Sequence, residues 1–465
     1  MTPNIAAAKE ALSHLDLDDK PASVKAKSRD FFWYSPVLKP RLDHLVGDFV
    51  VSPRSEAEVI EVLRVCYEHD VPVTTRGSGT GNYGQAMPLA GGCVLHMRHM
   101  NKVREIHPGR VIVEPGCILR DLDAETIRES GQEIRMFSST YATATVGGFI
   151  AGGSGGVGSV RWGQLRDLGN IIRLRVVTME AEPRVLEFTG EELHRVSHAY
   201  GTNGIITELE LPLAPSYAWT DVLVGFDDFM DAAKWAEDLG NQDGILTKLI
   251  TPVEAPIPHD YFLRIQSRIR RDQHVVIVMV APHNMDAFLT YAARHRGAEI
   301  IYRSDAVTAE EKKAFGVAYE YAWNHTTLRG LRVDPTITYL QVRYEDLAQV
   351  QAIRDRFGEE VPQHLEGIRM NGRMRFAGLP IVRFSTEERL EEIVRIHEDM
   401  GCLIFNPHRY TLEEGGRQSA DARQLDFKRE ADPKGLLNPG KMITWDAPDF
   451  NYSEVYRYSG MRPAG

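Results

Sequence analysis

The sequence predicts an α+β protein in which both ends of the chain form one domain and the middle is inserted as an α+β cap domain with an antiparallel sheet. The chain has 465 residues, enough for two domains with separate hydrophobic cores. Pro212 and Pro215 mark a change from loop-rich sequence to longer alternations of strands and helices, and the loop-rich texture returns from Gly401. We therefore expect domain boundaries at 1–215, 216–400 and 401–465.

The first part begins with a β-α-β unit. The segment 55–69 has the apolar periodicity of an amphipathic helix, with Ser55 as its cap and Glu58 three residues later. Little periodicity is found in 131–161. Strands are expected at 49–51, 71–75, 93–97, 102–106, 110–114, 171–178, 184–188 and 205–211, and helical segments at 119–129 and 191–198.

The middle part alternates strands and helices. Such alternation over about 185 residues favours one α+β domain built on an antiparallel sheet. We expect strands at 245–250, 261–266, 274–280, 298–302, 337–343 and 380–384, and helices at 285–296, 308–323, 345–357 and 386–400.

The composition excludes several classes of function. A net charge of -11 argues against nucleic acid or an anionic membrane as the main partner, because both are bound through excess Lys and Arg. No uncharged apolar stretch approaches the roughly 18 residues that span a bilayer, and residues 1–20 lack the features of a secretory signal. The four cysteines have no C-x-x-C spacing, which favours a cytoplasmic protein without a structural zinc or iron–sulfur site.

A glycine loop at 76–84 poses the central question. Its residues 79–84 satisfy G-x-G-x-x-G, which in a nicotinamide-binding Rossmann turn follows a strand and opens a helix. The next segment, 85–92, contains Pro88 and two adjacent glycines and therefore opposes a helix. Strand, glycine loop, strand is the predicted local structure, and no helix N-terminus is expected there to receive a pyrophosphate.

Two further segments come close to nucleotide-binding patterns. Residues 153–158 also satisfy G-x-G-x-x-G but precede a poor helix start, and 435–441 satisfy G-x-x-x-x-G-K but are followed by Met442 instead of Ser or Thr. Because glycine permits close approach and exposes amide donors, the three segments together favour a chain that lays bare backbone against phosphate.

Six motifs follow one another in a recognisable order. In this order the chain resembles the FAD-linked oxidases of the vanillyl-alcohol oxidase and p-cresol methylhydroxylase family, over roughly 45–215 and 401–445. The resemblance implies a two-subdomain PCMH-type FAD-binding domain formed from both chain ends, beneath the inserted cap. The motifs are D-F-V-V-S-P-R-S at 48–55, R-G-S-G-T-G at 76–81, V-E-P-G at 113–116, A-T-V-G-G at 144–148, Y-G-T-N-G-I-I-T at 200–207 and D-P-K-G-L-L-N-P-G-K at 432–441.

The resemblance also implies where FAD lies. The loop 76–84 would wrap the pyrophosphate, 140–158 would line the dinucleotide, 204–207 would lie along the cofactor and 438–441 would reach the flavin. Tight turns are the alternative for any single glycine, but they do not explain seven glycines within 147–158. The expected cofactor-binding residues are Arg76, Gly77, Ser78, Gly79, Thr80, Gly81, Asn82, Tyr83, Pro115, Gly116, Thr140, Thr143, Thr145, Val146, Gly147, Gly148, Ala151, Gly152, Gly155, Gly156, Gly204, Ile206, Asn438 and Lys441.

The same resemblance bears on flavin attachment. Family members that bond the flavin through a histidine of the first glycine loop carry it where Thr80 stands here, and no cysteine is present near 142–145. We expect non-covalent FAD, with attachment to a cap histidine as the open alternative.

Catalysis requires a C–H held about 3–3.5 Å from the flavin acceptor atom and a group that takes the proton. In similar proteins such groups come from the cap and from the segment that is 405–416 here. Related D-2-hydroxy-acid dehydrogenases carry a Ser-Glu-His-Gly pattern there and a distant G-D-G-N-x-H motif, which together make a metal site. This chain retains only His408 and has no G-D-G-N. We expect no metal, and His408 or Tyr410 as base or hydrogen-bond donor; a structural hydrogen bond is the alternative for His408.

Two cap stretches complete the expected site. Residues 323–327 are polar and aromatic at the end of a helix pattern, and the alternate side chains Tyr339, Gln341 and Arg343 share one face of a predicted strand. His325 and Arg343 are therefore expected to meet substrate, with buried polar groups of the cap core as the alternative.

The expected function is that of an FAD-dependent oxidase or dehydrogenase. It would oxidise the CH–OH group of a small hydroxylated substrate by hydride transfer, with oxygen, a quinone or another electron acceptor; aromatic and carboxylated substrates are both compatible. Two alternatives stay open: the flavin subunit of a glycolate- or D-lactate-like 2-hydroxy-acid dehydrogenase complex, and a non-redox enzyme that forms a flavin adduct. We expect the protein to be a homodimer.

Overall fold

The N-terminal sheet holds the predicted β-α-β unit. The structure is a computed structural model that describes residues 2–417 and 421–450. Strands β2, β4 and β3 are parallel neighbours, β1 pairs antiparallel with β2, and Ser55 caps the helix α4 by accepting from the Glu58 amide at 3.3 Å. The elements are β1 (Leu17–Asp18), β2 (Phe49–Val51), α4 (Glu56–Glu68), β3 (Val73–Arg76) and β4 (Cys93–His96).

The second sheet is antiparallel and ends at the predicted boundary. Its order is β5-β6-β10-β8-β9, and β7 also pairs with β10. The long strand β10 ends at Pro215, and the apolar face of the sheet is buried at Val111, Leu174 and Leu209. The elements are β5 (Val103–His107), β6 (Arg110–Val113), α5 (Leu119–Ser130), β7 (Gln132–Ile134), β8 (Arg173–Val177), β9 (Val185–Thr189) and β10 (Ile205–Pro215).

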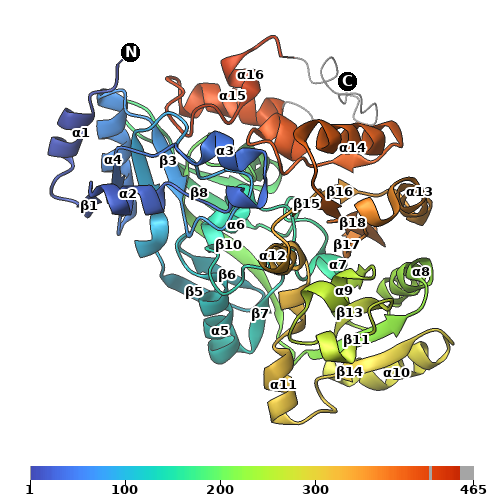
Figure 1. Ribbon diagram of the computed structural model, residues 1–465. Coiled ribbons are helices and arrows are strands. Elements are labelled where there is room, and N and C mark those ends of the chain that lie inside the picture. Colours follow the sequence, from blue (N-terminus) through green and yellow to red (C-terminus); the bar gives the residue numbers. More distant parts are fainter. Residues whose placement is uncertain (1, 418–420, 451–465) are drawn as a thin grey trace.

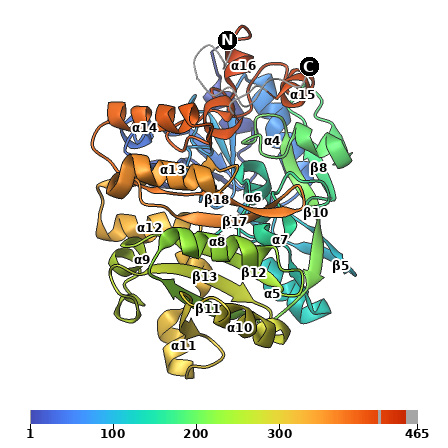
Figure 2. The ribbon, with the colours of Figure 1, turned by 90° about the vertical axis from the view of Figure 1, so that its right-hand side faces the viewer.

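The middle of the chain forms two antiparallel four-stranded sheets, in the orders β12-β13-β11-β14 and β17-β18-β16-β20, and a two-stranded pair β15-β19. Figure 2 shows helices α8 and α13 in front of the strands of the two larger sheets. Helix α8 contacts β12 and β13 of the first sheet, β17 of the second and also α13, and β12 and β17 are neighbours, so the helices cover one face of the two sheets. The strands are β11 (Thr220–Phe226), β12 (Thr247–Val253), β13 (His274–Val280), β14 (Glu299–Arg303), β15 (Ile337–Tyr339), β16 (Val342–Arg343), β17 (Leu365–Met370), β18 (Arg373–Gly378), β19 (Ile381–Arg383) and β20 (Leu403–Ile404). The helices are α8 (Phe229–Gly240), α10 (Met285–Ala293), α13 (Leu347–Phe357) and α14 (Glu387–Asp399).

Three predicted elements of the middle part are wrong. The segment 261–266 is not a strand: it follows helix α9 (Ile257–Tyr261), and burial recurs there every third residue, at Phe262 and Ile265. The predicted helix 308–323 ends early, because Gly316 (φ +86°) terminates α11 (Ala309–Phe315). The predicted strand 337–343 is broken between β15 and β16, which belong to different sheets.

Other elements were not predicted. Helix α6 (Val146–Gly152) lies in the glycine-rich stretch, where Thr145 caps it by accepting from the Gly148 amide at 3.2 Å. A hairpin joins β17 to β18 through Asn371 and Gly372, both at positive φ, a turn that an Asn-Gly pair favours. The other unpredicted helices are α1 (Ile5–Ala11), α2 (Pro21–Lys27), α3 (Leu38–Leu42), α7 (Ser159–Trp162), α8, α12 (Asn324–Val333), α15 (Ala422–Ala431) and α16 (Ile443–Asp446).

The C-terminal segment returns to the N-terminal sheet, as the warm-coloured ribbon of α15 (Ala422–Ala431) and α16 (Ile443–Asp446) shows in Figure 1. Leu437 bridges Val73 of β3, and the Lys434 ammonium donates to the Tyr67 carbonyl at 2.8 Å. Strand β20, by contrast, pairs with β16 of a middle-part sheet. The residues from 451 onward lie outside the described part of the chain. Within that described part, no helix combines the length and apolarity needed to cross a bilayer.

Candidate active site

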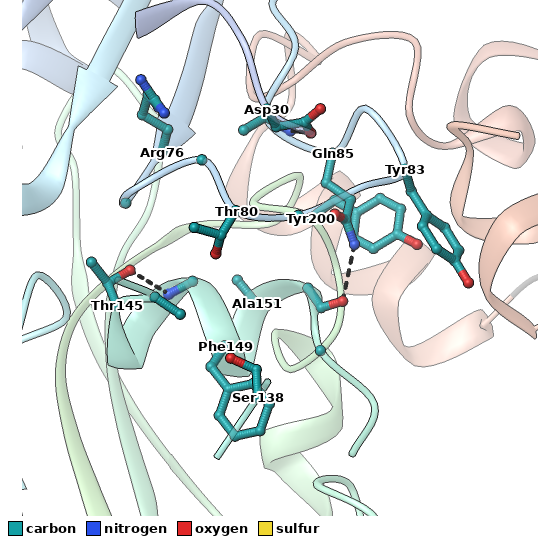
Figure 3. Close-up of a pocket in the computed structure, with 18 of the residues that line it drawn as sticks. Asp30, Arg76, Thr80, Tyr83, Gln85, Ser138, Thr145, Phe149, Ala151 and Tyr200 are labelled. Carbon is teal, nitrogen blue, oxygen red and sulfur yellow. Dashed lines mark hydrogen bonds between the residues drawn. The ribbon is translucent and has the colours of Figure 1, made fainter. Parts of the chain in front are cut away.

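A cavity of about 220 Å³ lies where the glycine-rich segments meet the middle of the chain. Figure 3 shows part of its wall, with the first glycine loop above helix α6. The loop between β3 and β4 contains no helix, as predicted for residues 77–92. The wall is therefore largely backbone on this side, and its segments are 75–86, 138–140, 144–155 and 196–206.

The first glycine loop packs too closely for side chains. A Cβ atom on Gly77 would stand 1.9 Å from the Thr145 hydroxyl oxygen, and one on Gly81 would stand 2.0 Å from the Gln85 amide oxygen. Gly79 has φ +66°, a conformation that glycine adopts without strain. Arg76 folds back to donate to the Ser78 carbonyl at 2.8 Å, and burial lowers its pKa. Close contacts with the cap of α6 and with neighbouring side chains thus favour glycine at these positions of the loop.

Gln85 joins the two glycine segments. Its amide nitrogen donates to the Gly152 carbonyl at 3.0 Å, drawn as a dashed line in Figure 3. Gly147 packs against Pro115: a Cβ added on Gly147 would stand 2.5 Å from the Cβ of Pro115. No periodicity or glycine pattern marks Gln85, so the sequence offered no signal for it.

The C-terminal return supports the loop from behind. The Lys441 ammonium donates to the Gly84 carbonyl at 2.5 Å, and the Asn438 amide donates to the carbonyls of Gln85 at 2.8 Å and Tyr200 at 2.6 Å. Neither side chain is part of the cavity wall as the structure describes it. Both were expected to contact the cofactor, and the geometry instead gives them contacts with the loop.

Asp30 is the acidic member of this support and does line the cavity. Its carboxylate accepts from the amides of Phe32 at 2.9 Å and Ala86 at 3.2 Å. Burial raises the pKa of Asp30 to about 6 and lowers the pKa of Lys441 to about 7, and the opposite charges partly offset both shifts. Asp30 was not predicted, because the N-terminal segment carries no motif.

Most of the expected cofactor-binding residues line the cavity, and four besides Asn438 and Lys441 do not. An added Cβ on Gly116 would meet the Met97 carbonyl oxygen at 2.0 Å, and one on Gly156 the Phe137 carbonyl oxygen at 2.1 Å. Val146 is buried and Thr143 is exposed. For Gly116 and Gly156 the geometry favours the tight-turn alternative. The expected residues found in the wall are Arg76, Gly77, Ser78, Gly79, Thr80, Gly81, Asn82, Tyr83, Pro115, Thr140, Thr145, Gly147, Gly148, Ala151, Gly152, Gly155, Gly204 and Ile206.

His408 is buried and is not among the described residues of the cavity wall. Its Nδ1 lies 2.7 Å from the Ser35 hydroxyl and its Nε2 lies 2.9 Å from the Tyr339 carbonyl oxygen, so Nε2 donates and Nδ1 accepts. Burial lowers the pKa of His408 to about 3. A neutral ring with both nitrogens engaged favours the structural alternative. The ring of Tyr410 packs against the Lys441 ammonium, whose nitrogen lies 4.9 Å from the ring centre. Tyr410 is not among the described residues of the cavity wall.

The two cap stretches reach the cavity through other residues than expected. His325, whose pKa burial lowers to about 4, and Arg343, 3.5 Å from Glu345, are not among the described residues of the wall. Gln341 lies in the short connection between β15 and β16 and lines the cavity. The middle and return segments contribute Trp323, Asn324, Gln341, Phe405 and Gly415.

The wall has the chemistry that FAD requires. Its glycine segments leave open backbone beside Arg76, and a dinucleotide offers phosphate, ribose and ring atoms that such backbone binds. Thr75 Oγ1 and Arg76 Nε are buried at the wall with no hydrogen-bond partner among the described residues. Aromatic rings of Phe31, Tyr34 and Tyr83 add apolar surface. Across 2–417 and 421–450, no group of three or more His, Cys, Asp and Glu side chains is arranged to hold a metal ion.

Comparisons with known proteins agree with this chemistry. Residues 47–187 match the model of the FAD binding domain family. The chain is 34% identical over 437 residues to the mitochondrial D-lactate dehydrogenase [cytochrome] of Arabidopsis thaliana, covering 86% of this chain and 74% of that protein. It is 26% identical over 433 residues to glycolate oxidase subunit GlcD of Bacillus subtilis, covering 86% of this chain and 90% of that protein.

Solved structures share the fold. The 4-ethylphenol oxidase of Gulosibacter chungangensis superposes with a TM-score of 0.65 at 18% identity, over 95% of this chain and 98% of that one. An alkyldihydroxyacetonephosphate synthase superposes with a TM-score of 0.66 at 16% identity, over 91% and 83% of the two chains. The chain therefore belongs to the family of FAD-linked oxidoreductases with a PCMH-type FAD-binding domain, and its cofactor is FAD.

Proposed function

We propose that the protein oxidises the CH–OH group of a small hydroxylated substrate by hydride transfer to the flavin. The observation that carries this proposal is a cavity whose lining combines glycine-rich backbone with Trp323, Asn324, Gln341 and Phe405. One side of such a cavity suits the cofactor and the other suits a small organic molecule. The D-lactate dehydrogenase and glycolate oxidase subunit among the relatives are named for hydroxy-acid substrates, which also supports CH–OH chemistry.

Within this proposal the glycine wall binds the non-covalent cofactor. The backbone amides of 77–81 would meet its pyrophosphate, and the rest of the wall would align it toward the cap. FAD supplies the redox chemistry when bound. The protein's own residues bind the substrate, exclude water through the aromatic rings, and hold the reacting C–H in line.

The test is anaerobic mixing of the FAD-loaded protein with a panel of hydroxylated compounds, including 4-hydroxybenzyl alcohol, D-lactate and glycolate. Bleaching of the flavin absorbance by at least one of them is expected, and a panel that leaves the absorbance unchanged contradicts the proposal. Admitting oxygen or a soluble quinone to the reduced protein then separates an oxidase from a dehydrogenase by which one restores the absorbance.

A second candidate is the flavin subunit of a 2-hydroxy-acid dehydrogenase complex. The similarity to a glycolate oxidase subunit over 90% of that protein favours it. Glycolate or D-lactate would then bleach the flavin, and electrons would pass to an artificial dye but not to oxygen. Equal reduction by a neutral alcohol and none by either acid would contradict this candidate.

We further propose the division 1–215, 216–400 and 401–465, and a cytoplasmic homodimer. The separate sheets on either side of Pro215 support the first boundary, whereas β20 shows that the returning chain still pairs with the cap sheet at 403–404. Limited proteolysis should cleave near 216 and 401, and light scattering should give twice the chain mass of 52.3 kDa.

A further inference from the structure

Trp323 has an unusual backbone conformation at the edge of the cavity. Its φ of 51° and ψ of −142° put a bulky residue in a region that L-residues avoid, immediately before helix α12. Such a conformation persists only where surrounding contacts hold it, and it clusters at binding sites. The contacts that hold Trp323 are therefore informative.

Glu366 supplies the holding contact. Its Oε1 accepts from the backbone amide of Trp323 and from Nε2 of His364 at 2.7 Å, and its Oε2 accepts from the Thr251 hydroxyl at 2.6 Å. Glu366, His364 and Thr251 are all completely buried. Hydrogen bonds to a buried carboxylate are strong, so Glu366 fixes the backbone of Trp323, from whose amide it accepts a hydrogen bond.

The next turn of the chain is fixed to the same cluster. The Thr326 hydroxyl donates to the Tyr321 carbonyl at 2.7 Å and lies 3.4 Å from Nε2 of His364. Thr326 is fully buried as well. Trp323 is thus fixed by two contacts: its own amide donates to Glu366, and the turn around it is closed by the hydrogen bond from Thr326 to the Tyr321 carbonyl.

The indole ring of Trp323 lies against the second glycine segment. An added Cβ on Gly155 would stand 3.4 Å from Cη2 of the ring. Asn324 and Gln341 adjoin Trp323 in the wall, with 3.5 Å between their amide groups. Together with Phe405, this side of the cavity consists of uncharged side chains.

We propose that Glu366 is a positioning residue that fixes Trp323 as the specificity-determining wall of the substrate cavity, and that this wall accepts an uncharged group of the substrate. The proposal rests on the proposed function and names the chemistry of its substrate side. A carboxylate placed against Trp323, Asn324, Gln341 and Phe405 would lose its hydration without gaining a cationic partner from them. An uncharged group of similar shape carries no such penalty.

The test uses the FAD-loaded full chain and two probes of similar shape, benzamide and benzoate, whose binding is followed by the change in flavin absorbance. Benzamide is expected to bind the parent protein at least about tenfold more tightly than benzoate. Glu366→Gln replaces an acceptor of three hydrogen bonds and should weaken benzamide binding about tenfold while FAD stays bound.

Glu413→Gln is the matched control. Glu413 is also a buried carboxylate, which accepts from the amides of Ile443 and Thr444 and from the Thr444 hydroxyl. It is not among the described residues of the wall. This variant should lose comparable thermal stability but retain the parent's ratio of the two affinities, because a general loss of packing does not select between the probes.

A double-variant cycle shows whether Glu366 acts through Trp323. If it does, Trp323→Leu with Glu366→Gln binds benzamide no more weakly than Trp323→Leu alone. The proposal is overturned if Glu366→Gln binds benzamide within twofold of the parent, if benzoate binds the parent as tightly as benzamide, if neither probe perturbs the flavin, or if the two effects add. Absence of flavin bleaching by every hydroxylated compound would overturn the proposed function alone, since the probes report binding without reaction.

Discussion

The two sides of the cavity differ in what lines them: backbone on one side and side chains on the other. On one side, backbone approaches so closely that a Cβ on Gly77 or Gly81 would overlap a neighbouring side chain. On the other side, Trp323, Gln341 and Phe405 present their side chains from three separate loops. A wall of closely packed backbone leaves little room for larger residues, whereas a wall of side chains can change its chemistry without changing the fold. This difference is the reason why we propose the first side for the cofactor and the second for the substrate.

The largest expected effect lies behind the glycine wall. Lys441→Met removes a buried cation whose charge lowers the pKa of Asp30, and with it the hydrogen bond to the Gly84 carbonyl. It should cost about 3 kcal/mol of unfolding free energy at pH 6.5, where both groups carry charge, together with FAD affinity. Chemical denaturation and FAD content after desalting measure both. The double variant Asp30→Asn with Lys441→Met should recover most of the stability, because no unpaired charge is left; a double variant as unstable as the single one contradicts the role given to this pair.

A smaller loss is expected on the glycine wall itself. Gly77→Ala places a Cβ 1.9 Å from the Thr145 hydroxyl, so the loop and α6 must separate. Overpacking of this kind costs roughly 1–3 kcal/mol, or about tenfold to a hundredfold in FAD affinity. Gly244→Ala is the control, since nothing lies within 4 Å of its added Cβ. Equal FAD retention by the two variants would mean that the close contact is not part of the binding wall.

The role of His408 has a pH signature. Its pKa is about 3 in the folded protein, below the ordinary value of 6.5, so the unfolded chain binds the proton first. Stability from this neutral histidine is complete above pH 6.5 and is lost as the pH falls toward 3, at about 1.4 kcal/mol per pH unit. His408→Asn should flatten the stability profile between pH 6 and 4 by about that slope and leave the rate of flavin reduction unchanged. A variant that abolishes flavin reduction while folding normally would restore His408 as the catalytic base.

The smallest effect on stability is expected on the cap side. Gln341→Leu should change the unfolding free energy by less than about 0.5 kcal/mol and leave FAD content unchanged, because only a cavity-facing side chain is altered. Its signature is a changed KM in steady-state turnover. Arg343→Gln, two residues along the chain, should leave KM at the parent value, and a larger effect of Arg343→Gln would reverse the assignment of these two residues.

The sequence predicted the helix-free glycine loop, for a physical reason. The glycines of 76–81 are recognisable as a motif from the sequence itself, and the proline and glycines of 85–92 exclude a helix locally. What the motifs lacked were the partners from elsewhere in the chain. Asp30 and Gln85 support the loop from segments without a pattern, and α6 forms in a glycine-rich stretch because Thr145 caps it and the loop covers it.

The cap side was predicted only to the level of the segment. The stretches around 323–327, 339–344 and 405–416 do reach the cavity, but through Trp323, Gln341 and Phe405 instead of His325, Arg343 and His408. Their orientation depends on distant contacts, such as Glu366 with the Trp323 amide and Ser35 with the His408 ring. The local sequence pattern around His408 carries no information about Ser35, which lies 373 positions away in the chain.

The central claim is that the glycine side binds the cofactor and the uncharged cap side receives the substrate. A structure of the FAD-loaded protein tests it most directly. We predict the pyrophosphate oxygens within hydrogen-bond distance of the backbone amides of 77–81, and the flavin ring facing Trp323 and Gln341. A pyrophosphate held away from 76–81, or a flavin ring turned from the cap side chains, would contradict the account.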